Sequence, residues 1–240
     1  MSRARPYLVI ALLWGLYFHP LILHPTQTLY ADFSDFLAEH LPARIFLVRE
    51  WRATGELPRW NPYHFCGTPF VHDIQVGLFY PPYAVAYFVP ESAVGAAMSW
   101  VVAVHVLLAG VLAFAYARWR GLGEVGALVA AAGFMLSAKW MTHLIVAGHT
   151  ITVGLAWLPL VLLGLESALR TGRVWPAVGA GAAFALLVLG THPQWAFYAA
   201  GFVALWTLGP ALERAGYLGA EPVPGGNLAR ELARWAGFGL

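Results

Sequence analysis

A polar stretch from His24 to Ala93 carries most of the side chains that could do chemistry in this chain of 240 residues. Carboxylates and imidazoles accept and deliver protons in catalysis, and both kinds gather here between two strongly apolar segments. We therefore expect any reaction to take place in this stretch. Its candidate residues are Asp32, Asp35, Glu39, His40, His64, Cys66, His72, Asp73 and Gln75.

Asp32 and Asp35 directly follow the first apolar segment. Ser34 is typical of a helix N-cap and Gly55 of a helix C-terminus, which predicts a helix that ends near Thr54. We expect it to be amphipathic and to lie along a membrane surface, kinked or split at Pro42. Its predicted apolar face comprises Leu37, Leu41, Ile45, Val48 and Trp51, with Arg44, Arg49, Glu50 and Arg52 mostly on the other side.

Two groups of residues could bind a metal ion, and each group also has a simpler interpretation. Asp35, Glu39 and His40 recur at one-turn spacing, and Asp73 could join Asp35 in holding a divalent cation. A solvated helix face explains the first group, and a turn-capping aspartate explains Asp73. No metal ligand is therefore assigned. A nucleotide cofactor is not expected, because the chain has no phosphate-binding or dinucleotide fingerprint.

Composition indicates what must position these residues. The chain is 60% hydrophobic and 11% charged, whereas about a quarter of the residues of a soluble domain are charged. The sequence thus predicts an all-α polytopic membrane protein with about six transmembrane helices. The predicted spans are Tyr7 to Leu23, Val94 to Tyr116, Val125 to Ser137, Thr152 to Leu169, Val174 to Leu189 and Trp195 to Leu212.

The end of the chain adds an expectation about its organisation. A seventh apolar run begins at Trp235, after residues 213–234, which read as a cytoplasmic linker. We expect residues 1–240 to form one transmembrane module at the N-terminal part of a longer protein. Residues 24–93 would be its long first extracytoplasmic loop.

Basic residues predict the orientation, because Lys and Arg accumulate in short cytoplasmic loops. A cytoplasmic N-terminus places nine of the fourteen basic residues inside, so the net charge of +2 reflects topology rather than nucleic-acid binding. The same orientation puts every histidine except His105 on the outer side. That distribution favours an outward-facing polar cavity for a charged ligand. Glu166, near an inner helix end, is expected to reach the cytoplasmic surface.

Dense Pro, Gly and Asn between Gly55 and Pro82 predict rigid turns rather than long helices or strands. Aromatic residues such as Trp60 and Tyr80 on this frame fit a membrane-interface belt or stacking on sugar rings. The single cysteine, Cys66, is interpreted as a small buried hydrophobe.

The chain resembles the YfhO-type bacterial membrane proteins, which are relatives of the GT-C glycosyltransferases. The matching pattern in the loop is Asp35, Pro42, Gly55-x-x-Pro58-x-Trp60-Asn61-Pro62, Gly67-x-Pro69, Gln75 and Phe79-Tyr80-Pro81-Pro82. Beyond the loop it continues as His105 with Ala109-Gly110, Ala156-Trp157-Leu158-Pro159 and Gly190-x-His192-Pro193-Gln194. His72-Asp73 departs from the more neutral pair of many relatives.

This resemblance implies a GT-C-like fold and a membrane glycosyltransferase. Such an enzyme moves a sugar from a polyprenyl-phosphate donor to a glycan, lipid or protein acceptor at the outer face of the bacterial plasma membrane. By position, Asp35 would be the general base and Asp32 its alternate. The residues expected to bind substrate are Trp60, Asn61, His72, Asp73, Gln75, Tyr80, His143, His149, His192 and Gln194.

Three other interpretations stay open. A transporter or flippase of lipid-linked precursors usually places ionisable residues in the middle of its spans, and this chain has few there. A histidine-based metal or haem protein would need paired histidines on facing helices, and only His105 lies within a predicted span. An inactive, truncated fragment is the third.

Overall fold

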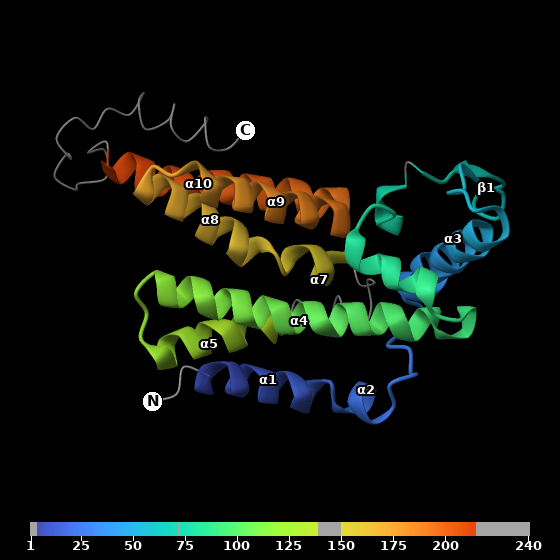
Figure 1. Cartoon of the computed structure of the whole chain (residues 1–240), viewed down its shortest axis with the longest axis horizontal. Coiled ribbons are helices and arrows are strands. Elements are labelled where there is room, and N and C mark those ends of the chain that lie inside the picture. Colours follow the sequence, from blue (N-terminus) through green and yellow to red (C-terminus); the bar gives the residue numbers. More distant parts are fainter. Residues whose placement is uncertain (1–3, 72, 139–149, 215–240) are drawn as a thin grey trace.

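The computed structural model describes residues 4–71, 73–138 and 150–214. Long helices run along the long axis of the molecule, and the 24–93 loop folds at one end of them (Figure 1). The helices are α1 (Arg5–Tyr17), α2 (His19–Leu23), α3 (Leu41–Thr54), α4 (Val94–Trp119), α5 (Glu124–Met135), α7 (Thr150–Leu155), α8 (Leu158–Thr171), α9 (Val174–Gly190) and α10 (Pro193–Arg214). The two strands are β1 (Trp60–Asn61) and β2 (Thr68–Pro69).

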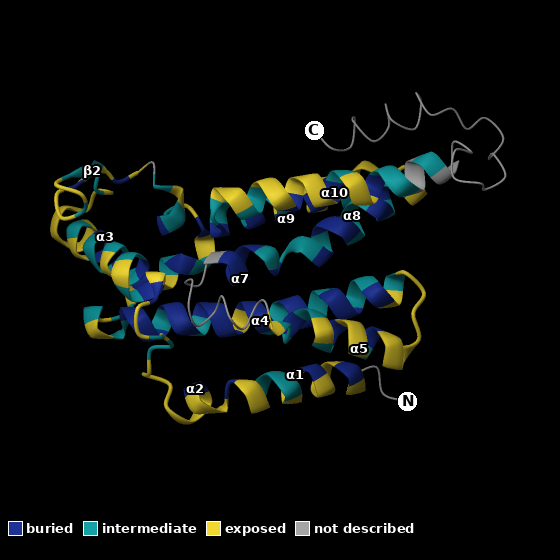
Figure 2. Ribbon diagram, turned by 180° about the vertical axis from the view of Figure 1, so that it is seen from behind, coloured by how far each residue is buried: buried dark blue, intermediate teal, exposed yellow. Residues whose placement is uncertain are grey.

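Helix α4 is the centre of the bundle and contacts α1, α5, α7 and α8. Small residues on α4 make this possible. A Cβ at Gly110 would lie 2.4 Å from the sulfur of Met135 on α5 and 3.0 Å from Cγ2 of Ile10 on α1. The buried residues concentrate on α4, while α1, α9 and α10 expose apolar side chains (Figure 2). The Ala109-Gly110 pair therefore has a packing role.

The prediction of six transmembrane helices is wrong. Within the described ranges, two helices are long and apolar enough to cross a membrane, Glu91–Trp119 and Ile151–Thr171. Buried core helices of soluble proteins meet the same two criteria. The expected fold class of a six-span, GT-C-like protein is thus corrected to an all-α bundle with two candidate spans.

Breaks in the apolar runs explain the difference. The first run is divided at Phe18, so that α1 has 13 residues and α2 has five. The third run forms α5, which at 1.5 Å per residue is about 18 Å long, well short of a hydrocarbon core of about 30 Å. Apolar composition alone shows neither the break at Phe18 nor the short length of α5.

The loop contains the predicted kinked helix. A π-helical turn, η1 (Phe36–His40), precedes α3, and the N–H of Leu41 donates to the carbonyl of Phe36. Pro42, which has no N–H, thus divides the helix as expected. Gly55, at a φ of +74°, ends α3 and donates its N–H to Trp51. The boundaries near Pro42 and Gly55 confirm the prediction.

The predicted apolar face of α3 is partly wrong. The side that packs against the rest of the protein carries Leu47, Val48 and Arg44, and all three are buried. Trp51 stays partly exposed beside Tyr87, with 4.8 Å between their ring centroids. The predicted residues Leu37, Leu41, Ile45 and Val48 do pack in one hydrophobic cluster. The buried face is wider than predicted, because Leu47 and Arg44 join it.

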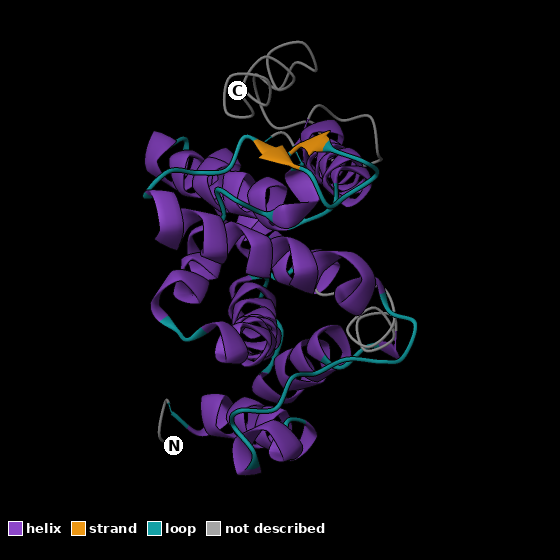
Figure 3. Cartoon of the chain, turned by 90° about the vertical axis from the view of Figure 1, so that its right-hand side faces the viewer, coloured by secondary structure: helices purple, strands orange, loops and turns teal. Residues whose placement is uncertain are grey.

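Beyond α3 the loop has little regular structure, as its Pro and Gly content predicts. Strands β1 and β2 pair antiparallel, with Trp60 opposite Pro69 and Asn61 opposite Thr68 (Figure 3). Three short 3₁₀ helices follow: η2 (Ile74–Val76), η3 (Pro81–Phe88) and η4 (Glu91–Ala93). The last of these leads directly into α4.

Candidate functional site

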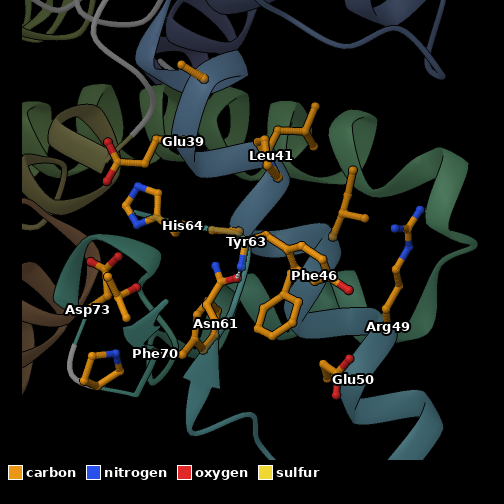
Figure 4. Close-up of a pocket in the computed structure, with 16 residues that line it drawn as sticks. Glu39, Leu41, Phe46, Arg49, Glu50, Asn61, Tyr63, His64, Phe70 and Asp73 are labelled. Carbon is orange, nitrogen blue, oxygen red and sulfur yellow. Dashed lines mark hydrogen bonds between the residues drawn. The ribbon is translucent and has the colours of Figure 1, made fainter. Parts of the chain in front are cut away.

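A cavity of about 480 Å³ lies between α3 and the β1–β2 hairpin (Figure 4). Pockets of roughly 300–1,000 Å³ are the usual size for small-molecule sites. Both polar and aromatic side chains line it. Those that matter below are Glu39, Phe46, Arg49, Glu50, Asn61, Tyr63, His64, Phe70 and Asp73.

The polar groups divide between two ends of the cavity. Glu39, His64 and Asp73 gather at one end, and Arg49 and Glu50 lie at the other (Figure 4). Two carboxylates beside an imidazole form a set of groups that can accept a proton from a substrate hydroxyl. Neither Glu39 nor His64 was expected to bind substrate from the sequence.

Aromatic rings form the middle of the wall. Phe46 contacts Phe70 and Tyr63 edge to face, with ring centroids 5.2 Å and 5.9 Å apart. These contacts tie the hairpin to α3. A cavity bounded by carboxylates, an amide and aromatic rings suits a ligand with both hydroxyl groups and apolar faces, such as a sugar.

Asp73 is held in place by its own turn. Its Oδ1 accepts the backbone N–H of Gln75 at 3.0 Å and caps the short helix η2. This confirms the interpretation of Asp73 as a turn-capping aspartate. The cap engages one carboxylate oxygen, and Asp73 also lines the cavity. The cap thus fixes the Asp73 side chain in a position where it lines the cavity and can reach a ligand.

The Trp60-Asn61 and Gly67-x-Pro69 motifs build the hairpin. Asn61 is buried, and its Oδ1 accepts the N–H of Tyr63 at 3.0 Å. Gly67 has a φ of +118°, and a Cβ there would lie 2.6 Å from the Trp60 ring. The glycine therefore serves both the turn and the close approach of the indole. Of the predicted pair, Asn61 lines the cavity and Trp60 does not.

Cys66 was interpreted wrongly from the sequence. It is exposed, with a φ of +60°, at the tip of the hairpin. Phe65 before it also has a positive φ, 45°. The turn that brings β2 back to β1 needs this left-handed backbone, so the thiol points away from any core.

Asp35 and Asp32, expected to act as catalytic bases, are exposed and do not line the cavity. Asp35 opens the π-helical turn, and Asp32 lies in the turn before it. Between them Phe33 has a φ of +62° and is fully exposed. A catalytic role for either aspartate stays a prediction.

Two basic residues, His40 at the end of η1 and Arg44 in α3, are buried. Burial lowers the pKa of His40, although the carboxylates of Glu39, Asp35 and Asp73 oppose that shift. Burial likewise lowers the pKa of Arg44, whose guanidinium lies 4.4 Å from the centroid of the Tyr83 ring. The two tyrosines that oppose this shift, Tyr83 and Tyr87, are themselves neutral at pH 7.

Tyr80 connects the loop to the helix bundle instead of reaching a ligand. Its hydroxyl accepts the indole N–H of Trp157 at 2.8 Å and lies 2.5 Å from Nε2 of His105. The Nδ1 of His105 lies 2.6 Å from the carbonyl of Val101. This network assigns the proton to Nδ1, so Tyr80 donates to Nε2. The motif residues Tyr80, His105 and Trp157 thus hold one another in place.

Gly190 belongs to the same contact. A Cβ at Gly190 would lie 3.1 Å from the Tyr80 ring. Two residues later, Nδ1 of His192 accepts the N–H of Gln194 at 3.2 Å, while Nε2 of Gln194 donates to the hydroxyl of Tyr198 at 2.8 Å. The Thr-His-Pro-Gln turn therefore starts α10. Neither His192 nor Gln194 lines the cavity.

The remaining predicted residues divide in two. Gln75 is partly buried beside Asp73 and contributes its backbone N–H to the cap. His72, His143 and His149 lie outside the described residues. Within the described ranges, no three His, Cys, Asp or Glu side chains gather closely enough to hold a metal ion.

The opposite end of the bundle holds a second polar group, the Glu166 cluster. Glu166 accepts from Tyr116 at 2.5 Å, Trp206 at 2.7 Å and Arg120 at 2.9 Å, and Arg170 lies 3.5 Å away. Its side chain is 2% exposed, so the prediction that it reaches the cytoplasmic surface is wrong. The donors from α4, α8 and α10 compensate its burial.

Compared with protein-family models, with curated proteins and with solved structures, the chain matches none. The resemblance to YfhO-type proteins therefore stays a prediction.

Proposed function

We propose that this chain transfers a sugar from a polyprenyl-phosphate donor to an extracytoplasmic acceptor, and that the cavity between α3 and the hairpin holds the acceptor. In this proposal the bacterial plasma membrane contains the bundle, with the 24–93 loop at its outer face. Helices Glu91–Trp119 and Ile151–Thr171 are the segments suited to cross it.

One observation carries the proposal. The cavity places the carboxylates of Asp73 and Glu39 beside aromatic rings in the only long polar stretch of the sequence. Sugar transfer needs a group that removes the proton of the attacking hydroxyl, and a carboxylate can do this. The rings of Phe46 and Tyr63 offer surfaces for the apolar face of a sugar.

We assign the general base to Asp73. The cap hydrogen bond to Gln75 fixes this carboxylate, and a fixed base acts on a bound hydroxyl more effectively than a mobile one. The acceptor hydroxyl passes its proton to Asp73 while its oxygen forms a bond to the anomeric carbon. The bond between that carbon and the phosphate oxygen breaks, and the lipid phosphate leaves with the electron pair. Glu39 orients the acceptor by hydrogen bonds.

Matched carboxylate variants test this assignment. The full chain is placed in membranes as wild type, Asp73→Asn, Glu39→Gln and Asp35→Asn, and transfer from polyprenyl-phosphate sugars is measured per folded molecule. Asparagine at position 73 keeps the cap, because its side-chain oxygen still accepts the Gln75 N–H. Asp73→Asn therefore tests the base without removing the turn.

We expect Asp73→Asn to lower the transfer rate by about 100-fold or more, within the usual range for loss of a general base. A loss in Asp35→Asn alone would return the base to the position expected from the sequence. No transfer by the wild type with any donor would reject the proposed function.

Transport of a lipid-linked precursor is the alternative. A transporter often carries ionisable residues within its spans, and Glu166 lies in a candidate span. However, Glu166 is engaged by Tyr116, Trp206 and Arg120. A carboxylate with this many donors is suited to hold helices together, which favours transfer over transport.

A further inference from the structure

The 24–93 loop contains a buried cation for which the described residues supply no counter-ion. Arg44 is 2% exposed, and its Nη2 donates to the carbonyl of Val76. Its Nε and Nη1 are buried and make no hydrogen bond. In the part of the chain that the structure describes, no carboxylate forms an ion pair with Arg44.

Such a group is expensive to bury. A guanidinium removed from water needs an anion and hydrogen-bond acceptors to offset the loss of hydration. The face of Tyr83 supplies a cation–π contact, and Val76 supplies one acceptor. Two of the three guanidinium nitrogens remain unpaired, which points to an acceptor from outside the chain.

A second unpaired donor lies beside Arg44. The hydroxyl of Tyr83 is buried without a hydrogen bond, although the guanidinium lies against its ring. A Cβ at Gly77 would lie 3.0 Å from the Tyr83 ring and 3.5 Å from the carbonyl of Leu189, which places this ring beside the end of α9.

Two buried threonines lie in the bundle, where α7 packs against the end of α9. Thr191 follows α9 directly, and a Cβ at Gly154 of α7 would lie 2.4 Å from its Cβ. The hydroxyls of Thr191 and Thr152 are buried and unpaired as well. We call Arg44 and Tyr83, together with the end of α9 beside the Tyr83 ring, the loop–bundle junction. It combines one positive charge with one free hydroxyl donor.

We propose that the loop–bundle junction binds a phosphate group, with the guanidinium of Arg44 and the hydroxyl of Tyr83 as its main donors. A guanidinium offers paired N–H groups that match two oxygens of a phosphate. The junction is closed to solvent, so the loop must move away from the bundle to admit the ligand, which then bridges the two. This site is distinct from the cavity that Glu39 and Asp73 line, and it stands whether or not that cavity transfers sugar.

The test measures the unfolding midpoint and ligand affinity of the purified full chain. One arm adds inorganic phosphate at constant ionic strength, with chloride as the reference salt. The other arm uses phosphatidylcholine vesicles that contain or lack phosphatidic acid. The proteins are wild type, Arg44→Gln, Tyr83→Phe and Arg52→Gln. Arg52 is the matched control, because it also donates to loop carbonyls but is exposed.

Phosphate is expected to raise the midpoint of wild type and Arg52→Gln. Arg44→Gln should bind at least roughly tenfold more weakly, as expected for loss of a charge-assisted hydrogen bond, with a smaller loss in Tyr83→Phe. A rise with phosphatidic acid but not with inorganic phosphate also supports the site and identifies a lipid as the source. No rise in either arm overturns the proposal. If Arg44→Gln does not fold, an unchanged affinity in Tyr83→Phe overturns it.

Discussion

Each end of the helix bundle has a buried charged group, and the two groups differ in how many partners they have. The Glu166 cluster gives its carboxylate three hydrogen-bond donors, one of which is Arg120, and a second arginine, Arg170. At the loop–bundle junction, Arg44 has one acceptor, and two of its nitrogens have none. Both groups are buried to the same degree, 2% exposed. The two groups therefore differ in the number of hydrogen-bond and ionic partners that offset their burial, and not in how far they are buried.

This contrast indicates what each end is for. A buried charge whose partners all come from the chain fixes the relative positions of helices, here α4, α8 and α10. A buried charge without partners destabilises the ligand-free protein and persists where binding uses it. We therefore expect the Glu166 cluster to hold the helices together, and we expect ligands to bind at the loop end.

The largest expected effect is a difference in transfer rate between a variant of the Glu166 cluster and a variant of the cavity. Glu166→Gln should leave the transfer rate per folded molecule near that of wild type, whereas Asp73→Asn lowers it by about 100-fold or more. The reason is that the Glu166 cluster lies at the end remote from the cavity. Initial rates normalised to the folded fraction measure both. A comparable fall in the rate of Glu166→Gln would break the distinction between the ends.

Tyr80→Phe tests the connection between loop and bundle. It leaves Nε2 of His105 and the indole N–H of Trp157 without their partner. We expect the free energy of unfolding to fall by about 2 kcal/mol, the usual cost of stranding buried polar groups. Chemical denaturation measures it, with the exposed Tyr30→Phe as control. An unchanged stability would mean that this network does not hold the loop.

Gly67→Ala tests whether the close approach of Gly67 to the Trp60 ring stabilises the hairpin. The new methyl group would meet the Trp60 ring, and alanine disfavours a φ of +118°. We expect the free energy of unfolding, measured by chemical denaturation, to fall by about 1–2 kcal/mol, as for other overpacked sites. Gly55→Ala is a useful control, since Gly55 also has a positive φ but nothing lies within 4 Å of its added Cβ. Equal losses in both variants would show that backbone strain alone is responsible.

The smallest effect is a pH dependence from His40. Burial lowers the pKa of this histidine in the folded protein below its ordinary 6.5. As the pH falls below about 6.5, the unfolded chain takes up the proton first, so stability declines until folded His40 is protonated too. His40→Gln should flatten this part of the curve. Unfolding midpoints between about pH 7 and pH 5 test it, and an unchanged slope would contradict the assignment.

Several local features of the fold were predictable from sequence because their causes are local. Pro42 divides the loop helix and Gly55 ends it through backbone chemistry that needs no tertiary context. The Ser34 cap was not found: its hydroxyl is buried without a partner. The number of spans was overestimated, because Pro20 at the start of α2 interrupts the first apolar run near Phe18 and because α5 has only 12 residues.

The candidate site was predictable in region but only partly in residues. Asn61 and Asp73 line the cavity as expected, and Glu39 and His64 stand in the same polar stretch. Arg44 was assigned to solvent because a charged residue on a helix is usually exposed. Its i+4 spacing from His40 was the available signal, since both lie on the face that becomes buried. Tyr80 was assigned to substrate because its partner, Trp157, is distant in sequence.

The most direct test of the contrast compares the free energies of unfolding of Glu166→Leu and Arg44→Met without ligand. Loss of Glu166 removes the acceptor of Tyr116, Trp206 and Arg120, so a fall of about 2 kcal/mol or more is expected from the loss of these hydrogen bonds. Arg44→Met replaces an uncompensated charge with an apolar chain, and stability should stay within about 1 kcal/mol of wild type or rise. A fall in Arg44→Met as large as in Glu166→Leu would contradict the account, because Arg44 would then be a compensated structural residue.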